Sequence, residues 1–160
     1  MKNVEKIVEN LIKTLSKRNQ TVSFAESCTG GRIAAAFTAV SGSSAILHGS
    51  CVTYANEIKE QWLGVPREIL ETKGAVSQEC VEYMLKGMEK MAASDYTLAV
   101  SGIAGPTGGT EFKPVGTVYI GVRTPDGKDE VHHCLFQGDR HQVQDQATSF
   151  AIELLAEKIN

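Results

Sequence analysis

The stretch Thr21–Gly31, Thr-Val-Ser-Phe-Ala-Glu-Ser-Cys-Thr-Gly-Gly, joins a strand-like run to a turn of small residues. Residues 21–25 have the apolar and β-branched content of a buried strand, and an alanine-rich helical pattern begins at Arg32. A helix start offers unpaired N–H groups to an anion, and glycines let a ligand approach the backbone. The stretch therefore predicts a strand-to-helix turn that carries nucleophilic atoms, although local capping by serine and threonine explains the same residues.

Helical and strand patterns alternate along the rest of the chain. In chain order they predict a helix over 2–18, the strand over 21–25, a helix over 32–40, a strand over 49–55, a helix from an Asn56 cap to Gly64, a short helix from Pro66 to about Gly74, a helix from a Ser77 cap to about Ala92, a strand over 96–101, strands over 115–124 and 130–136, and a final helix capped by Asp139.

This order of elements predicts an α/β fold. Strands separated by helices imply a parallel sheet covered on both faces, whereas Asp126-Gly127 between two β-rich runs predicts a hairpin and thus an antiparallel strand. We expect a three-layer α/β/α sandwich around a mixed, mostly parallel sheet of about five strands. Residues 1–160 fit one domain.

Composition excludes several classes of function. The formal net charge is −3 and no block of lysine or arginine occurs, which argues against a nucleic-acid surface. Residues 1–18 alternate charged and apolar side chains and lack the apolar core of a signal peptide or membrane span, so we expect a cytoplasmic protein with no membrane partner. The cysteines and histidines show no zinc-like spacing, so we expect reduced thiols and no metal.

Polar or glycine-rich residues follow each of the first three predicted strands. They are the turn over 26–31, Tyr54 with Lys59 a helical turn beyond it, and the loop Gly102–Gly109. In open α/β sheets, ligands bind outside the carboxyl ends of parallel strands. The three strand ends are therefore expected to form one site.

Ser27 is a candidate nucleophile and Lys59 a candidate base. A serine hydroxyl needs a neighbour that removes its proton, and a lysine can do this where burial keeps it neutral. A solvent-facing position on its helix is the plain alternative for Lys59. Tyr54 can hold the lysine, relay a proton or simply pack, and Cys28 is the rival nucleophile.

The other candidates would bind the ligand. Glu26 can orient the lysine or the ligand, or it can face water. Arg140 at a helix start either binds a phosphate through two parallel hydrogen bonds or is solvated. Backbone amides of the turn and of the glycine loop can hold an oxyanion, phosphate or sugar, unless the loop is only a connection. The full set is Glu26, Cys28, Thr29, Gly30, Gly31, Gly102, Gly105, Thr107, Gly108 and Arg140.

Several longer motifs follow one another along the chain. They are Ala25–Gly31, Val52-Thr53-Tyr54 with Asn56 and Lys59, Gly64-Val65, Gly74–Ser77, Ser101–Gly109, Lys113–Val118 and Gly138-Asp139-Arg140. Together they resemble the CinA C-terminal domain family over essentially the whole chain. That family includes bacterial nicotinamide mononucleotide deamidases.

The resemblance implies a metal-free amidohydrolase without a cofactor, which converts nicotinamide mononucleotide to nicotinic acid mononucleotide and ammonia. It maps a Ser/Lys dyad onto Ser27 and Lys59 and implies an α/β/α fold and a homodimer. Many members are fused behind a domain similar to a molybdopterin-binding fold; nothing here corresponds to it, so we expect the stand-alone form. Gln144 departs from the family, whose members usually carry an arginine one turn after Gly-Asp-Arg, and this leaves activity open.

A regulatory module that binds a pyridine nucleotide without turnover is the alternative interpretation of the same loops. Tight ligand binding without ammonia release would distinguish it from the enzyme. A role as a DNA-uptake or recombination partner, suggested by the competence-related family name, finds no support in the charge distribution.

Overall fold

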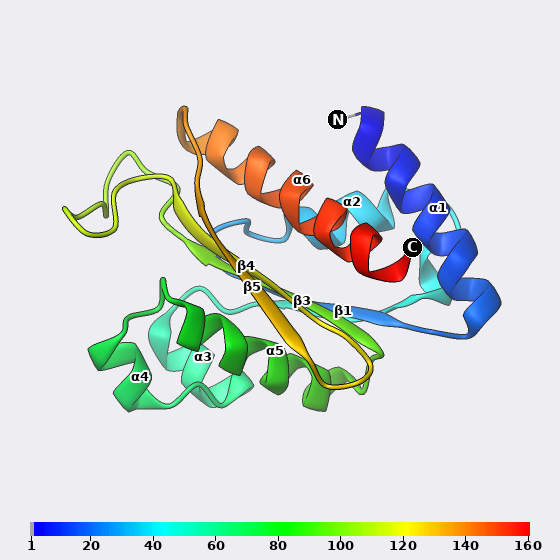
Figure 1. Cartoon of the computed structure of the whole chain (residues 1–160), viewed down its shortest axis with the longest axis horizontal. Coiled ribbons are helices and arrows are strands. Elements are labelled where there is room, and N and C mark those ends of the chain that lie inside the picture. Colours follow the sequence, from blue (N-terminus) through cyan, green and yellow to red (C-terminus); the bar gives the residue numbers. More distant parts are fainter. Residues whose placement is uncertain (1) are drawn as a thin grey trace.

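The computed structural model describes residues 2–160 as a five-stranded sheet between two layers of helices (Figure 1). The helices are α1 (Lys2–Arg18), α2 (Arg32–Thr38), α3 (Asn56–Leu63), α4 (Arg67–Thr72), α5 (Gln78–Ala92) and α6 (Arg140–Ile159), with a 3-10 turn η1 (Ser43–Ala45). The strands are β1 (Val22–Glu26), β2 (Leu47–Val52), β3 (Tyr96–Gly102), β4 (Thr117–Arg123) and β5 (Asp129–Leu135).

The sheet is mixed, with strand order β2-β1-β3-β4-β5. Strand β1 pairs in parallel with β2 and β3, while β4 is antiparallel to both β3 and β5. Only β4 therefore runs against the other four strands, which confirms the predicted mixed, mostly parallel sheet. The carboxyl ends of β1, β2 and β3 consequently lie at one edge of the sheet.

Helices cover both faces of the sheet. Helices α1, α2 and α6 pack on one face and α3, α4 and α5 on the other (Figure 1), each layer with its own apolar core. All five positions of β1 are buried because this interior strand has neighbours on both edges and helices on both faces. The first buried strand of the sequence thus lies inside the sheet, between β2 and β3, and the turn that follows it starts from a rigid support.

The predicted elements occur with small shifts of their boundaries. Ser77 caps α5 by accepting a hydrogen bond from the Cys80 amide, and Asp139 forms a capping box with Gln142 at the start of α6. The predicted cap of α3 was wrong: Ala55 holds the extended cap position without a side-chain bond, and Asn56 is already helical.

The second strand also differs from its predicted range of 49–55. It begins at Leu47 and ends at Val52, so Thr53 and Tyr54 lie outside it. The Thr53 amide still donates to the Glu26 carbonyl of β1 at 2.9 Å, while the carbonyls of Thr53 and Tyr54 accept hydrogen bonds from the Lys59 amine. The two residues that β propensity assigns to the strand therefore bond to the next helix, which propensity does not take into account.

Helix α3 packs closely against α5 at Gly87. A Cβ atom added at Gly87 would lie 2.0 Å from the carbonyl oxygen of Leu63, the last residue of α3. This distance is far below any real carbon–oxygen contact, so the two helices meet only because position 87 has no side chain. Since α3 carries Lys59, the contact also sets the position of that lysine.

We expect Gly87→Ala to lower the free energy of unfolding by about 1–3 kcal/mol, because overpacking outweighs the gain of ~1 kcal/mol in helix propensity. Urea denaturation measures the change. Lys86→Ala, on an exposed position of the same helix, is the control and should change stability by less than about 0.5 kcal/mol. A Gly87→Ala protein as stable as the wild type would disprove the close contact.

Candidate active site

Ser27 and Lys59 lie in contact at the edge of the sheet where β1 and β2 end. Lys59 Nζ is 3.0 Å from Ser27 Oγ, and the two residues are 1% and 7% exposed, respectively. The alternative of a solvent-facing Lys59 is therefore wrong. The structure brings the predicted nucleophile and base together from two segments that are separated along the chain by α2, η1 and β2.

The Lys59 amine is surrounded by three oxygen atoms. Besides Ser27 Oγ, it contacts the carbonyl oxygens of Thr53 at 2.7 Å and Tyr54 at 3.1 Å. No carboxylate within residues 2–160 forms an ion pair with it. Burial lowers the pKa of Lys59 below its usual value of 10.5, and the nearby thiols of Cys80 and Cys28 oppose this shift.

This set of contacts suits a neutral amine. A neutral lysine has two N–H groups, which the two backbone carbonyls accept, and one lone pair, which can accept the proton of the Ser27 hydroxyl. Each group in the contact is then satisfied without any counter-charge. The arrangement is chemically that of a general base beside a nucleophile.

The rival nucleophile, Cys28, lies in a poor environment for attack. Burial raises the pKa of its thiol to about 12, although the charge of Lys59 partly offsets that shift. The thiol is therefore protonated at neutral pH, whereas the thiolate is the reactive form. Cys28 is therefore a weaker candidate for the nucleophile than Ser27, whose hydroxyl contacts the Lys59 amine.

Two amides of the turn after Ser27 have no oxygen acceptor among residues 2–160. The Gly30 amide donates to Ser27 O at 3.0 Å and the Gly31 amide to Glu26 Oε1 at 3.1 Å, so both serve the turn itself. Within residues 2–160, the amides of Cys28 and Thr29 donate to no backbone or side-chain oxygen. The donors available to an oxyanion are thus those of Cys28 and Thr29, and the two glycines provide the left-handed backbone that the turn needs.

Glu26 has a different role from either expectation. Its side chain is fully buried and accepts hydrogen bonds from Thr29 Oγ1 and from the amides of Gly31, Ile33 and Ala34, at 2.6 to 3.1 Å. The carboxylate neither orients Lys59 nor faces water. It satisfies the unpaired N–H groups at the start of α2 and the positive end of the helix dipole.

Arg140 connects two of the predicted strand ends. Its guanidinium donates to the Gly105 carbonyl at 2.7 Å and to the Tyr54 hydroxyl at 3.1 Å. The Tyr54 hydroxyl therefore faces Arg140, and only the backbone carbonyl of Tyr54 holds Lys59. Because a guanidinium has more N–H donors than these two contacts use, Arg140 can still bind an anion at the rim of the site.

The glycine loop divides into a packed part and an exposed part. A Cβ at Gly102 would lie 2.7 Å from Val118 Cγ2, and one at Gly105 would lie 2.3 Å from Val115, so these glycines are required by packing. Thr107 and Gly108 are exposed, and in the part of the chain that the structure describes no hydrogen bond joins either one to the dyad. The structure thus does not bring these two residues to the reacting atoms.

Two residues at the site were missed by sequence reasoning. Thr53 contributes a carbonyl to Lys59, and the Gln144 side chain donates to the Cys28 carbonyl at 3.0 Å. Thr53 acts through its backbone carbonyl, so its residue type in the sequence does not indicate this role. The departure of Gln144 from the family pattern draws attention to position 144 but does not indicate the contact with Cys28.

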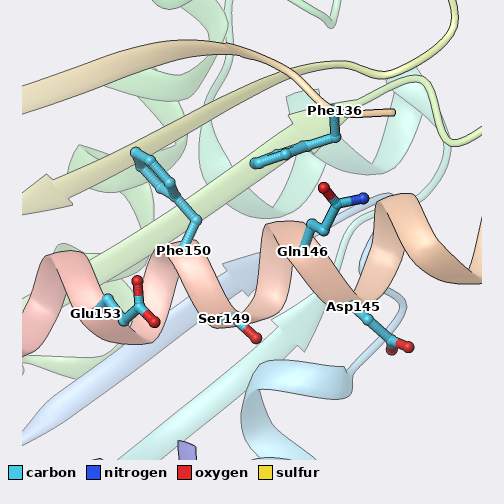
Figure 2. Close-up of a pocket in the computed structure, with 6 residues that line it drawn as sticks. All are labelled: Phe136, Asp145, Gln146, Ser149, Phe150 and Glu153. Carbon is cyan, nitrogen blue, oxygen red and sulfur yellow. The ribbon is translucent and has the colours of Figure 1, made fainter. Parts of the chain in front are cut away.

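A separate cavity of about 300 Å³ lies between α6 and the segment after β5 (Figure 2). It is lined by Phe136, Asp145, Gln146, Ser149, Phe150 and Glu153, none of which is a predicted site residue.

Nowhere in residues 2–160 are three or more His, Cys, Asp or Glu side chains grouped to hold a metal ion. No described helix is both long enough and apolar enough to cross a membrane.

Comparison with known proteins identifies the family. The family model described as the CinA C-terminal domain matches residues 4–159. The chain belongs to this family. The described fold agrees with that of solved members: a competence/damage inducible protein from Agrobacterium tumefaciens superimposes with a TM-score of 0.94 at 36% identity, covering 96% of this chain and 94% of the other.

Curated relatives fall into two groups by length. The nicotinamide-nucleotide amidohydrolase PncC of Escherichia coli strain K12 is 46% identical over 92% of this chain and 89% of its own length. A CinA-like protein of Fervidobacterium nodosum is 49% identical over 88% of this chain but only 34% of its own length. This CinA C-terminal domain thus spans about a third of the longer CinA-like relatives.

We expect Glu26→Ala to lower the free energy of unfolding by about 3 kcal/mol or more, because it leaves several amides at the start of α2 unpaired in a buried place. Chemical denaturation measures the loss. Glu57→Ala is the control, since Glu57 is an exposed carboxylate in the first turn of α3, and it should cost less than about 1 kcal/mol. Equal losses in the two variants would contradict the buried anchoring role of Glu26.

Proposed function

We propose that this chain hydrolyses the carboxamide of nicotinamide mononucleotide to nicotinic acid mononucleotide and ammonia. Ser27 is the nucleophile and Lys59 the general base. The observation that carries the proposal is the 3.0 Å contact between Ser27 Oγ and a buried lysine amine that has no carboxylate partner in residues 2–160. The choice of substrate is supported by the 46% identity to the Escherichia coli nicotinamide-nucleotide amidohydrolase.

In the first half of the reaction, Lys59 accepts the Ser27 proton as Oγ attacks the carboxamide carbon. The resulting ammonium ion keeps the carbonyls of Thr53 and Tyr54 as acceptors, so the charge forms where oxygens already lie. The amides of Cys28 and Thr29 donate to the oxyanion, and each such donor commonly stabilises the transition state by ~3 kcal/mol.

In the second half, the Lys59 ammonium protonates the nitrogen of the amide. Ammonia then departs, and the acyl group remains bonded to Ser27 Oγ. Neutral Lys59 then accepts a proton from water, which attacks the acyl carbon. Collapse of that intermediate returns the proton to Ser27 Oγ and releases the carboxylate product. A single lysine thus serves as base and acid in turn.

The nucleotide part of the substrate would bind beside Arg140 and the glycine loop. Arg140 is held by Gly105 and Tyr54, and its remaining donors can pair with a phosphate. Binding of the phosphoribosyl group far from the reacting bond would orient the amide toward Ser27. Tyr54 acts in this scheme through its carbonyl on Lys59 and its hydroxyl on Arg140.

The proposal includes the wider setting that the family resemblance implies. Residues 1–160 would act as one amidohydrolase domain, as a homodimer, in the cytoplasm. Light scattering of the purified chain tests the oligomer, since a monomer at all concentrations would remove that part of the proposal.

Incubation of the purified chain with nicotinamide mononucleotide should release ammonia and nicotinic acid mononucleotide in equal amounts. An enzymatic ammonia assay and chromatography of the nucleotides measure the two products. Tight binding of the nucleotide without ammonia release over a range of pH would instead identify the non-catalytic regulatory module.

We expect Ser27→Ala to abolish ammonia release, because among residues 2–160 no other hydroxyl is bonded to the Lys59 amine. Cys28→Ala should keep most of the activity, since the thiol is protonated at neutral pH and its backbone amide is retained. Steady-state kinetics of both variants make the comparison. The reverse order of activities would assign the nucleophile to Cys28.

The rate should rise with pH through the pKa of Lys59 and level off above it. The base must be neutral to accept a proton, and burial places its pKa below 10.5, so activity is lost as pH falls through that lowered value. Measurement of kcat/KM against pH locates the inflection. Lys59→Met, which cannot accept a proton, should lose roughly 10²–10⁴-fold in rate. A wild-type rate that is flat from about pH 6 to 9 would argue against lysine as the base.

A further inference from the structure

Gln144, near the other end of the chain, contacts the turn over residues 27–31 that carries Ser27, which we call the nucleophile turn. Its side chain is 6% exposed, and its Nε2 donates to the Cys28 carbonyl at 3.0 Å, across 116 positions of sequence. We propose that Gln144 is a positioning residue that aims the Thr29 amide at the oxyanion. This inference rests on the proposed reaction and assigns a role within it.

The geometry of the peptide bond connects Gln144 to the reacting atoms. The Cys28 carbonyl and the Thr29 N–H belong to one planar peptide group, in which a trans bond points the C=O and N–H in opposite directions. A hydrogen bond that fixes the carbonyl oxygen therefore also fixes the direction of the N–H. Donation to the carbonyl further polarises the group and strengthens the N–H as a donor.

The rest of the turn is restrained from the other side. Thr29 Oγ1 donates to Glu26 at 2.6 Å, and Gly31 N donates to the same oxygen at 3.1 Å. The peptide between Cys28 and Thr29 thus lies between two anchors, one on β1 and one on α6. Its N–H is left without an oxygen acceptor in residues 2–160, as an oxyanion donor should be.

Helix α6 gives Gln144 a rigid support. Val143, Ala147 and Ala151 on the same helix are fully buried in the core, and Thr148 Oγ1 donates to the Gln144 carbonyl at 2.7 Å. A side chain on such a helix holds its partner more accurately than one on a loop. The side-chain amide of Gln144 supplies the N–H donor that this task needs.

The test compares two glutamines on the same helix. Gln144→Met removes the donor to Cys28, and we expect kcat to fall roughly tenfold, less than the ~10²–10³-fold that loss of a direct oxyanion donor costs. KM should stay unchanged if Gln144 acts only on the turn, since its side chain is 6% exposed and its amide is bonded to the Cys28 carbonyl. Gln146→Met is the control: it removes bonds to the carbonyls of Gln137 and Gln142, away from the turn, and should leave kcat unchanged.

A rescue variant separates positioning from packing. Gln144→Arg restores an N–H donor to the Cys28 carbonyl, so its kcat should exceed that of Gln144→Met at equal thermal stability. Should Gln144→Met not fold, Gln144→Glu replaces it, since an ionised glutamate keeps the shape and lacks the donor. A donor-free variant with wild-type kcat would overturn the inference, as would a loss that Gln144→Arg does not recover.

A second readout does not depend on the natural substrate. p-Nitrophenyl acetate acylates an activated serine through the same oxyanion, and mass spectrometry of the Ser27 peptide follows the reaction. The acylation rate should fall in Gln144→Met and not in Gln146→Met. If the wild type is acylated but releases no ammonia from nicotinamide mononucleotide, only the substrate assignment fails and the comparison still decides the role of Gln144. If Ser27 is not acylated and no ammonia forms, both proposals are overturned.

Discussion

The burial of the Lys59 amine without a counter-charge is the constraint on which this site depends. A buried amine must be neutral or must find oxygen atoms, and here it has two backbone carbonyls and one hydroxyl. Strand β2 ends at Val52, and the carbonyls of the next two residues, Thr53 and Tyr54, accept hydrogen bonds from the amine. Helix α3 reaches the required depth because Gly87 of α5 offers no side chain.

The turn that carries Ser27 is the second feature on which the site depends. A buried carboxylate on β1 and a buried amide on α6 hold it from opposite sides, through Glu26 and Gln144. Each anchor bonds to the backbone, which leaves Ser27 Oγ for the lysine. Helices from both layers of the sandwich thus meet at one sheet edge, α3 with the base and α6 with the anchor and with Arg140.

Local signals in the sequence predicted much of the fold. The buried strand and small-residue turn at 21–31, the Asp126-Gly127 hairpin and the caps Ser77 and Asp139 all occur where the pattern places them. These features depend on residues within a few positions of one another, so a single sequence contains their full cause. The Ser27 and Lys59 pairing followed from one more step, since parallel strands bring their carboxyl ends to the same edge.

The sequence by itself therefore determined the order of elements, the mixed sheet and the edge at which chemistry gathers. Tertiary structure alone decided how Glu26, Tyr54 and Gln144 are used: the first binds helix amides, the second holds Lys59 by a backbone carbonyl, and the third bonds to Cys28 across 116 positions. Backbone groups are the same at every position, and a contact over such a separation depends on the packing of entire helices. Neither leaves a pattern in the local sequence.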